Sequence, residues 1–409
     1  MKYIVILGDG MADLPVDVLG NKTPLQVAIK PNMDFFAQYG KTGLVKTVPD
    51  GIPPGSDPAN MSVLGFDPRL YYTGRSPIEA VSMGINLAEQ DVAFRCNLVN
   101  LSDGEPYENK QMIDYSSDEI STAEAAELIQ SVNEIFANND IQFYPGISYR
   151  HCMVWHGSGL TVKCTPPHDI MDQQVLTHLP KDDVIPEQAE VLNKIMKESF
   201  AVLSKHEVNL ERVKRGLKPA NSLWIWGQGK RLYLPAFQEK YQLSGAAISA
   251  VDLVKGIGIS TGLQSIDVPG ATGIIDTNYE GKAMAAVKAL KEGADFVYVH
   301  IEAPDECGHR HEIENKVKAI EYIDSRLIAV ILKEISCFDD YSILVLPDHP
   351  TPLSLRTHTS DPVPFAVYTK SKHLENKSCA GYSEAEAAKT RLYIEEGFTL
   401  MDKFIGQEF

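Results

Sequence analysis

The sequence predicts an α/β protein built on a parallel sheet flanked by helices, with an α+β domain inserted into the chain. Two observations predict this class. Apolar, β-branched runs alternate with helical patterns near the start of the chain and again after about residue 219, which is typical of a parallel sheet covered on both faces. The stretch between them combines alternating strand-like runs with two helical patterns, which is typical of a separate α+β domain.

Each element of the outer part is predicted from its own apolar pattern. The stripe formed by Ile320, Ile323, Leu327 and Ile331, for example, has helical periodicity. The predicted strands are 3–7, 222–226, 246–250, 296–301 and 343–346, and the predicted helices are 251–255, 281–290, 316–335 and 383–390.

The inserted part is predicted to contain strands at 92–99 and 147–155 and helices at 121–137 and 187–206. We therefore expect a discontinuous catalytic domain, 1–75 with 219–409, and an inserted substrate-binding cap domain, 76–218. Such nesting would place a mobile cap over the outer domain, an arrangement that sequesters a reactive intermediate from water.

Composition excludes several classes of protein. The 409-residue chain is 44% hydrophobic and 23% charged, as expected of a globular protein, and its net charge of −17 argues against nucleic-acid binding. No run is long enough to span a bilayer, and the first residues do not resemble a signal peptide. Six cysteines without CxxC spacing suggest free thiols, so we expect a cytoplasmic enzyme.

Metal-ligand residues follow two of the predicted strands. Asp305 and His309 come after strand 296–301, Asp348 and His349 come after strand 343–346, and His358 follows shortly. Oxygen and imidazole donors without thiolates suit Mn, Zn or Mg rather than a structural zinc site. Five such ligands are more than one ion usually takes from a protein, so the sequence points to two metal ions.

Asp9 and Ser56 supply further candidates. Asp9 ends the first strand, where α/β folds place ligands, and Ser56 follows a Pro-Pro-Gly turn at the expected start of a helix. A helix N-terminus favours anions, and a serine beside a metal can be an activated nucleophile. Each residue also has an ordinary interpretation, such as a helix cap or a turn. Their occurrence together in four segments that follow strands or turns favours the functional interpretation.

Several motifs carry a resemblance that extends over almost the entire chain. The chain resembles the archaeal-type cofactor-independent phosphoglycerate mutases, of the alkaline phosphatase superfamily. The motifs are Gly8-Asp9-Gly10, Gly55-Ser56-Asp57-x-Ala-Asn, Ala303-Pro-Asp-Glu-x-Gly-His309, Asp348-His349-x-Thr-Pro, His358-x-x-Asp-Pro-Val-Pro, Thr73-Gly-Arg-Ser-Pro-Ile-Glu, Trp224-Ile-Trp-Gly and Pro269-Gly-Ala-Thr-Gly.

The resemblance implies an alkaline-phosphatase-like sheet and a two-metal site, with Mn preferred over Zn, Co or Mg. One ion would be held by Asp305, His309 and His358, and the other by the group Asp9, Ser56, Asp348 and His349. It also implies that Ser56 takes the phosphate of 3-phosphoglycerate as a phosphoserine and returns it to the 2-hydroxyl of glycerate, in glycolysis and gluconeogenesis.

Basic residues are the main candidates for contacts with the substrate. Lys255 is the preferred phosphate contact, and Arg95 and Arg150 lie in apolar runs where a carboxylate partner would explain them. His151 is placed to assist proton transfer. A surface lysine, structural ion pairs and a packed histidine are the competing interpretations. The further candidates are Arg75, Arg231 and His168, and the other histidines, including His300, are interpreted as structural or surface residues.

Two other functions remain open at this stage. A phosphotransferase with the same metal chemistry but another acceptor, such as a kinase acting on homoserine, would differ only in the cap residues. A catalytically inactive binding module is the second alternative, and the presence of all seven expected ligands argues against it.

Overall fold

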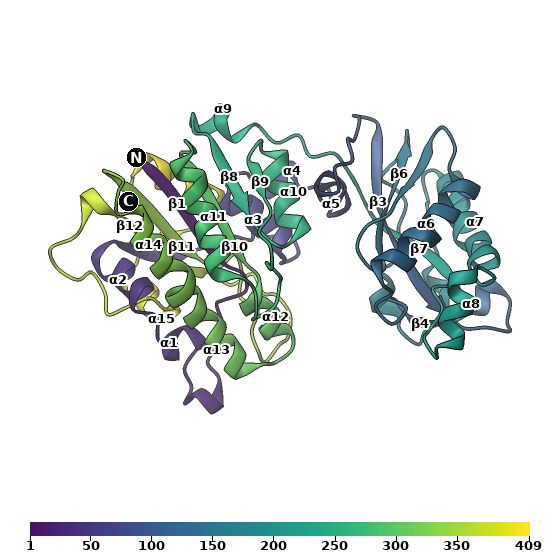
Figure 1. Cartoon of the computed structure of the whole chain (residues 1–409), viewed down its shortest axis with the longest axis horizontal. Helices are drawn as coiled ribbons and strands as arrows, with labels where there is room; N and C mark the ends of the chain where they lie inside the picture. Colours follow the sequence, from purple (N-terminus) through teal and green to yellow (C-terminus); the bar gives the residue numbers. More distant parts are fainter. The chain divides into compact units, whose positions relative to one another are not determined.

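The computed structural model describes all residues, 1–409, and the chain divides into two compact units (Figure 1). The first unit contains Met1–Tyr72 and Tyr233–Phe409, and the second contains Thr73–Leu232. The second unit therefore begins three residues earlier and ends fourteen residues later than the expected cap domain, 76–218. No helix has the combination of length and apolar character needed to cross a membrane.

An eight-stranded sheet forms the centre of the first unit, in the order β13-β2-β12-β11-β1-β10-β8-β9. The strands β9, β8, β10, β1 and β11 are mutually parallel, as predicted, whereas β12 is antiparallel to both β11 and β2. The bounds are β1 Lys2–Gly8, β2 Lys41–Val45, β8 Gly245–Ile248, β9 Gln264–Ile266, β10 Phe296–Ile301, β11 Tyr341–Leu346, β12 Val363–Thr369 and β13 Tyr393–Ile394.

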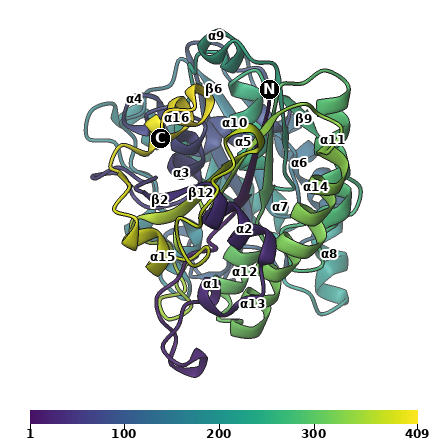
Figure 2. The ribbon, with the colours of Figure 1, turned by 90° about the vertical axis from the view of Figure 1, so that its left-hand side faces the viewer.

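Helices cover this sheet. One core cluster joins Ile4, Ile6 and Val299 of the sheet to α2, α11, α13 and α14, and Figure 1 shows α11, α13 and α14 across that face. The α15 helix lies beside β2 and β12 (Figure 2). The helices are α1 Pro24–Val27, α2 Pro31–Tyr39, α3 Ser56–Val63, α4 Pro68–Tyr71, α9 Phe237–Tyr241, α10 Asp252–Ser260, α11 Tyr279–Lys291, α12 Ala303–His309, α13 Ile313–Tyr322, α14 Ala329–Ile335, α15 Glu384–Lys389 and α16 Leu400–Gly406.

The predicted helix 316–335 is therefore present, but a π-helical segment, Ile323–Ile328, separates α13 from α14. Short 3₁₀ turns, η1 Asp17–Leu19, η6 Lys370–Lys372 and η7 Gly397–Thr399, complete the unit.

The second unit is a five-stranded antiparallel sheet with helices packed on it. The long strand β3 pairs with β4, β6 and β7, and β5 pairs with β6. The strands are β3 Asp91–Leu101, β4 Met112–Asp114, β5 Ile141–Tyr144, β6 Arg150–His156 and β7 Ser222–Lys230. The helices are α5 Ser76–Ser82, α6 Thr122–Phe136, α7 Pro186–Leu203 and α8 Glu207–Lys214, with 3₁₀ turns at Tyr107–Asn109, Pro167–Ile170 and Val175–His178.

The prediction that strand 222–226 belongs to the outer sheet was wrong. This strand, β7, pairs with β3, and Leu223, Trp224 and Ile225 are buried in the core of the second unit. An apolar run shows that a segment is a buried strand but does not show with which strand it pairs.

The sheet order brings three sequence-distant strand ends together. In the first unit, β1 lies between β10 and β11 and is parallel to both. Because parallel neighbours end at the same edge of a sheet, the residues that follow these strands, Asp9, Asp305 and Asp348, meet there.

Candidate active site

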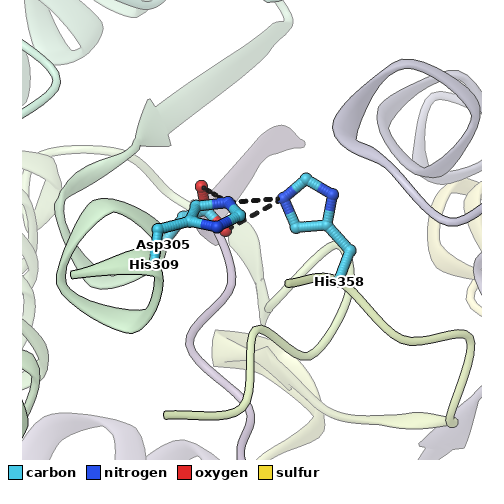
Figure 3. A group of neighbouring side chains, drawn as sticks. All are labelled: Asp305, His309 and His358. Atoms are coloured by element: carbon cyan, nitrogen blue, oxygen red, sulfur yellow. Dashed lines mark hydrogen bonds and ion pairs between the residues drawn. The ribbon is translucent and has the colours of Figure 1, made fainter. Parts of the chain in front are cut away.

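Asp305, His309 and His358 converge on one point (Figure 3). Asp305 and His309 lie one turn apart on α12, and His358 comes from the loop after β11. The Nε2 atom of His309 lies 3.2 Å from Asp305 Oδ2 and 2.9 Å from His358 Nε2, and His358 Nε2 lies 3.4 Å from Asp305 Oδ1. All three ligand atoms are therefore close enough together to contact a single cation.

The residues Asp9, Ser56, Asp348 and His349 form a second group beside the first. His349 Nε2 lies 3.2 Å from Ser56 Oγ and 3.5 Å from both Asp9 Oδ1 and Asp348 Oδ2. Ser56 is the first residue of α3, with Gly55 at the N-cap position. The serine hydroxyl is thus at the amino end of a helix, where the helix dipole favours negative charge.

Hydrogen bonds orient Asp348 from several sides. The backbone N–H groups of Gly10 and His349 donate to Oδ1, at 3.1 and 2.9 Å, and Asn60 Nδ2 donates to Oδ2 at 2.8 Å. The Tyr298 hydroxyl donates in turn to Asn60 Oδ1 at 2.6 Å. These contacts fix one carboxylate rotamer, which reduces the ordering needed to bind a ligand.

The electrostatics of the two groups differ. Burial and the neighbouring Asp348 carboxylate raise the pKa of Asp9 well above its usual value. Burial also acts to raise the pKa of Asp305, but hydrogen bonds from His309 and His358 outweigh it and hold that pKa well below the usual range. Hydrogen bonding to Asp305 raises the pKa of His309 to about 9.

These residues fit divalent cations. Asp9 is fully buried and its Oδ1 atom accepts no hydrogen bond, and an unsatisfied buried carboxylate oxygen is costly unless it binds a cation. Three buried aspartates share the site with His349, whose pKa is lowered by burial. The donors are all oxygen and imidazole nitrogen, the set that Mn and Zn accept.

His300, predicted to be a structural or surface residue, is a buried neighbour of this site. Its Nε2 atom lies 2.8 Å from Asp9 Oδ2, and its Nδ1 atom lies 3.1 Å from Ser249 Oγ. Burial lowers the pKa of His300 to about 3, so the neutral ring orients Asp9. Its position in the apolar run 296–301, one residue before the end of that strand, was the only signal in the sequence.

Thr351 and Lys282 also lie near this site and were not predicted from the sequence. The Thr351 hydroxyl donates to Asp305 Oδ1 and lies 3.3 Å from His349 Nδ1, so it touches both groups. Lys282 on α11 is fully buried and donates to the backbone oxygen of His300 at 3.0 Å. Nothing in the helical pattern of α11 distinguishes this lysine from the surface lysines around it.

Several predicted substrate-binding residues lie together in the second unit. Glu79 on α5 pairs with Arg75 at 3.2 Å and with Arg95 at 3.0 Å. The Arg95 guanidinium stacks over Trp226 at 4.3 Å, and the His168 ring lies 5.4 Å from the Trp226 ring.

Aromatic residues link His168 to Arg150, and the whole set of neighbouring side chains from Arg75 to Arg150 is called the arginine row. His168 meets Tyr115 at 6.0 Å, Tyr115 meets Tyr149 at 5.6 Å, and Arg150 lies 5.5 Å from the Tyr149 ring. The row therefore combines three arginines with aromatic faces, a composition suited to a small anionic ligand.

The remaining predicted residues make other contacts. Lys255, on α10 of the first unit, pairs with Asp267 at 2.6 Å. Arg231 donates to the backbone oxygen of Leu87 at 3.1 Å. His151 is 4% exposed, and burial lowers its pKa to about 3. Its Nδ1 atom accepts a hydrogen bond from Gly146 N, so its proton is on Nε2.

The fold and this donor set define a class: an α/β protein with a candidate divalent-cation centre at the carboxyl end of a parallel sheet. The profile of the 2,3-bisphosphoglycerate-independent phosphoglycerate mutase family matches residues 37–209. A relative from Geobacter sulfurreducens, named a probable 2,3-bisphosphoglycerate-independent phosphoglycerate mutase, is 52% identical over 405 residues, covering 99% of this chain and all of the relative. The chain therefore belongs to this family of isomerases and is an enzyme.

Two solved structures resemble the whole chain. The PH0037 protein from Pyrococcus horikoshii aligns with a TM-score of 0.82 at 28% identity, covering 99% of this chain and 96% of that one. A cofactor-independent phosphoglycerate mutase from Thermoplasma acidophilum aligns with a TM-score of 0.68 at 29% identity, covering all of both chains. These likenesses confirm the predicted fold class.

Proposed function

We propose that this enzyme interconverts 3-phosphoglycerate and 2-phosphoglycerate through a phosphoserine on Ser56, and that it does so in the cytoplasm. The observation that supports this most directly is the placement of Ser56 Oγ, 3.2 Å from His349 Nε2 and at the amino end of α3. A nucleophilic hydroxyl beside cation ligands is the arrangement that phosphoryl transfer to serine requires.

The reaction divides into two balanced half-reactions. Ser56 Oγ loses its proton and attacks phosphorus, the bond from phosphorus to the 3-oxygen breaks, and that oxygen takes a proton. The 2-hydroxyl of the retained glycerate then loses its proton and attacks the phosphoserine, the bond from phosphorus to Ser56 Oγ breaks, and Oγ takes a proton. No net proton or external phosphate donor is needed, which agrees with the independence from 2,3-bisphosphoglycerate in the family name.

The candidate ligands divide between two cation positions. We propose that Asp305, His309 and His358 hold one divalent ion, and that Asp9, Asp348, His349 and Ser56 hold the other, with Mn preferred. Bound cations at these positions supply a lowered pKa for the Ser56 hydroxyl and neutralise charge on the phosphoryl oxygens.

The protein's own groups orient the reactants. Asn60 Nδ2 donates both to Asp348 and to the backbone oxygen of Ser56, at 2.8 and 2.9 Å, so it ties the nucleophile to its neighbouring carboxylate. The carboxylate of the substrate is proposed to bind the arginine row, in which Glu79 holds Arg75 and Arg95 in place. A guanidinium pairs well with a carboxylate because it presents two parallel N–H donors.

The test is conversion of 3-phosphoglycerate to 2-phosphoglycerate with added Mn²⁺ and no bisphosphoglycerate, measured for wild type, Ser56→Ala and Ser62→Ala. Ser62 lies on the same helix, is buried, and its hydroxyl has no hydrogen-bond partner. Ser56→Ala should lose about 1000-fold or more of kcat, and Ser62→Ala should stay near wild type. Substrate labelled with ³²P should mark wild type and Ser62→Ala but not Ser56→Ala.

Turnover by a folded, metal-loaded Ser56→Ala near the wild-type rate would reject the nucleophile. A wild type that labels Ser56 but forms no 2-phosphoglycerate would instead reject the acceptor. That result would favour the phosphotransferase alternative, to be tested with ATP and homoserine.

A further inference from the structure

A fully buried ion pair lies behind the site, outside both ligand groups. Lys316 on α13 and Asp13 have no exposed side-chain surface, and Lys316 Nζ lies 2.7 Å from Asp13 Oδ2. The same ammonium donates to the backbone oxygen of Thr351 at 2.8 Å and to that of Ala12 at 3.4 Å. Every contact of Lys316 Nζ is therefore made to a segment that leads into the site.

Asp13 contacts the same segments from the other side of the pair. Its two carboxylate oxygens each accept from Leu353 N at 3.2 Å, and Oδ1 also accepts from Leu14 N at 2.8 Å. The ion pair thus joins the loop after β1, which begins with Asp9, to the loop after β11, which carries Asp348.

Lys316 brings in the third ligand-bearing segment. It lies on α13, which directly follows the helix α12 that carries Asp305 and His309. The connection reaches the site through Thr351: Lys316 holds its backbone oxygen, while its hydroxyl contacts Asp305 Oδ1 and His349 Nδ1. Only one residue, Thr351, separates the ammonium from a member of each cation group.

We infer that Lys316 and Asp13 are positioning residues that set the spacing between the two cation groups by holding Thr351. This inference rests on the proposed cation site. Removing the charge on Lys316 frees the Thr351 backbone, so the Thr351 hydroxyl no longer holds Asp305 and His349 at fixed positions. The affinity for cations then falls even though no ligand has been changed.

A purely structural role fits this ion pair less well. Desolvating two charges offsets most of their attraction, and an apolar pair of similar volume often gives equal or greater stability. Further hydrogen bonds also surround the ion pair. Glu384 accepts from Asp13 N at 3.1 Å and from the Thr23 hydroxyl at 2.7 Å, so a second carboxylate fixes the backbone of Asp13. Outer contacts of this kind control the orientation of metal ligands.

The matched control is another buried cation, in the second unit, which pairs with a half-buried carboxylate. Arg212 is 2% exposed and its Nη1 atom lies 2.7 Å from Glu124 Oε2. None of its hydrogen bonds involves a residue of the cation groups. Lys316→Met and Arg212→Met therefore both remove a buried cation from a carboxylate, but only the first change reaches Thr351.

The experiment is calorimetric titration of metal-free full-length protein with Mn²⁺, without substrate. We expect Lys316→Met to bind Mn²⁺ about 10- to 100-fold more weakly than wild type, with unchanged stoichiometry, and Arg212→Met to bind like wild type. Asp13→Asn is the second variant, used if Lys316→Met does not fold. It keeps an acceptor for Leu353 N and should weaken binding in the same direction.

Wild-type Mn²⁺ affinity in a folded Lys316→Met or Asp13→Asn overturns the inference. Equal weakening by Arg212→Met also overturns it, because the effect would then be one of general stability. A wild type that binds no Mn²⁺ rejects the proposed cation site itself, and this outcome is seen before any variant is compared.

Discussion

Gly10 is the position where one methyl group should most disturb the site without altering a ligand. Its φ is +58°, and an added Cβ would lie 2.6 Å from Asp305 Oδ1 and 2.8 Å from Asp305 Cα, and would also overlap the Thr351 hydroxyl. Because the α-carbon of Asp305 is backbone, a rotamer change cannot relieve the overlap. Gly10→Ala must displace α12 or the loop after β1.

Gly20 provides a control for the backbone conformation. Its φ is +70°, and a Cβ there would have no heavy atom within 4 Å. Gly20→Ala should cost only the left-handed conformation, about 1–2 kcal/mol. Gly10→Ala should cost this amount plus the overpacking, about 1–3 kcal/mol more. The extra cost corresponds to a separation in Tm of about 2–12 °C, at about 2–4 °C per kcal/mol for a unit of this size.

The assay is thermal unfolding in chelator, followed by Mn²⁺ titration of both variants. We expect Gly10→Ala to have the lower Tm and, because Asp305 moves, to bind Mn²⁺ about 10- to 100-fold more weakly, whereas Gly20→Ala binds like wild type. Equal Tm values for the two variants would show that the Asp305 backbone yields without cost. Unchanged Mn²⁺ affinity in Gly10→Ala would refute the link between this close contact and the cation site.

Three further predictions concern single side chains. His358→Ala should lower the Mn²⁺ content measured by metal analysis, since it removes one of three converging donors; an unchanged content of two ions would remove His358 from the ligand set. Arg95→Ala should lower kcat/KM by about 10- to 100-fold through loss of a charged hydrogen bond, with unchanged Mn²⁺ affinity, and wild-type kinetics would exclude a substrate contact. Burial lowers the pKa of His151 from 6.5 to about 3. Below pH 6.5 this histidine is therefore protonated in the unfolded chain but still neutral in the folded protein. The free energy of unfolding consequently falls as the pH drops from 6.5 toward 3. His151→Asn should flatten this slope in urea titrations between pH 7 and about pH 4, and an unchanged slope would contradict a buried neutral histidine.

The residue pattern within each segment was sufficient to predict most of the helices and strands. The apolar runs at 3–7, 296–301 and 343–346 are the strands β1, β10 and β11, because a strand buried on both faces requires a continuous apolar sequence. The ligand-type residues directly after these runs were recognisable for the same reason. Each one interrupts an apolar pattern at a place where a parallel strand ends.

The residue pattern within a segment did not predict which strands pair with each other. The run 222–226 has the character of a core strand, yet β7 pairs with β3, because strand partners are chosen by contacts between segments far apart in sequence. The strands β12 and β2 extend the large sheet through antiparallel pairing for the same reason.

The sequence by itself determined the class of fold, the family resemblance and the residues proposed as cation ligands, since these depend on residue type and on spacing within short segments. Only the tertiary structure showed that His300 orients Asp9, that Thr351 touches both ligand groups, and that Lys316 and Asp13 pair behind them. Apart from the local contact between Thr351 and His349, those contacts join residues 46 to 303 positions apart, and their energies depend on burial. A buried lysine and a surface lysine look the same in a helical sequence, and the difference arises when the chain packs.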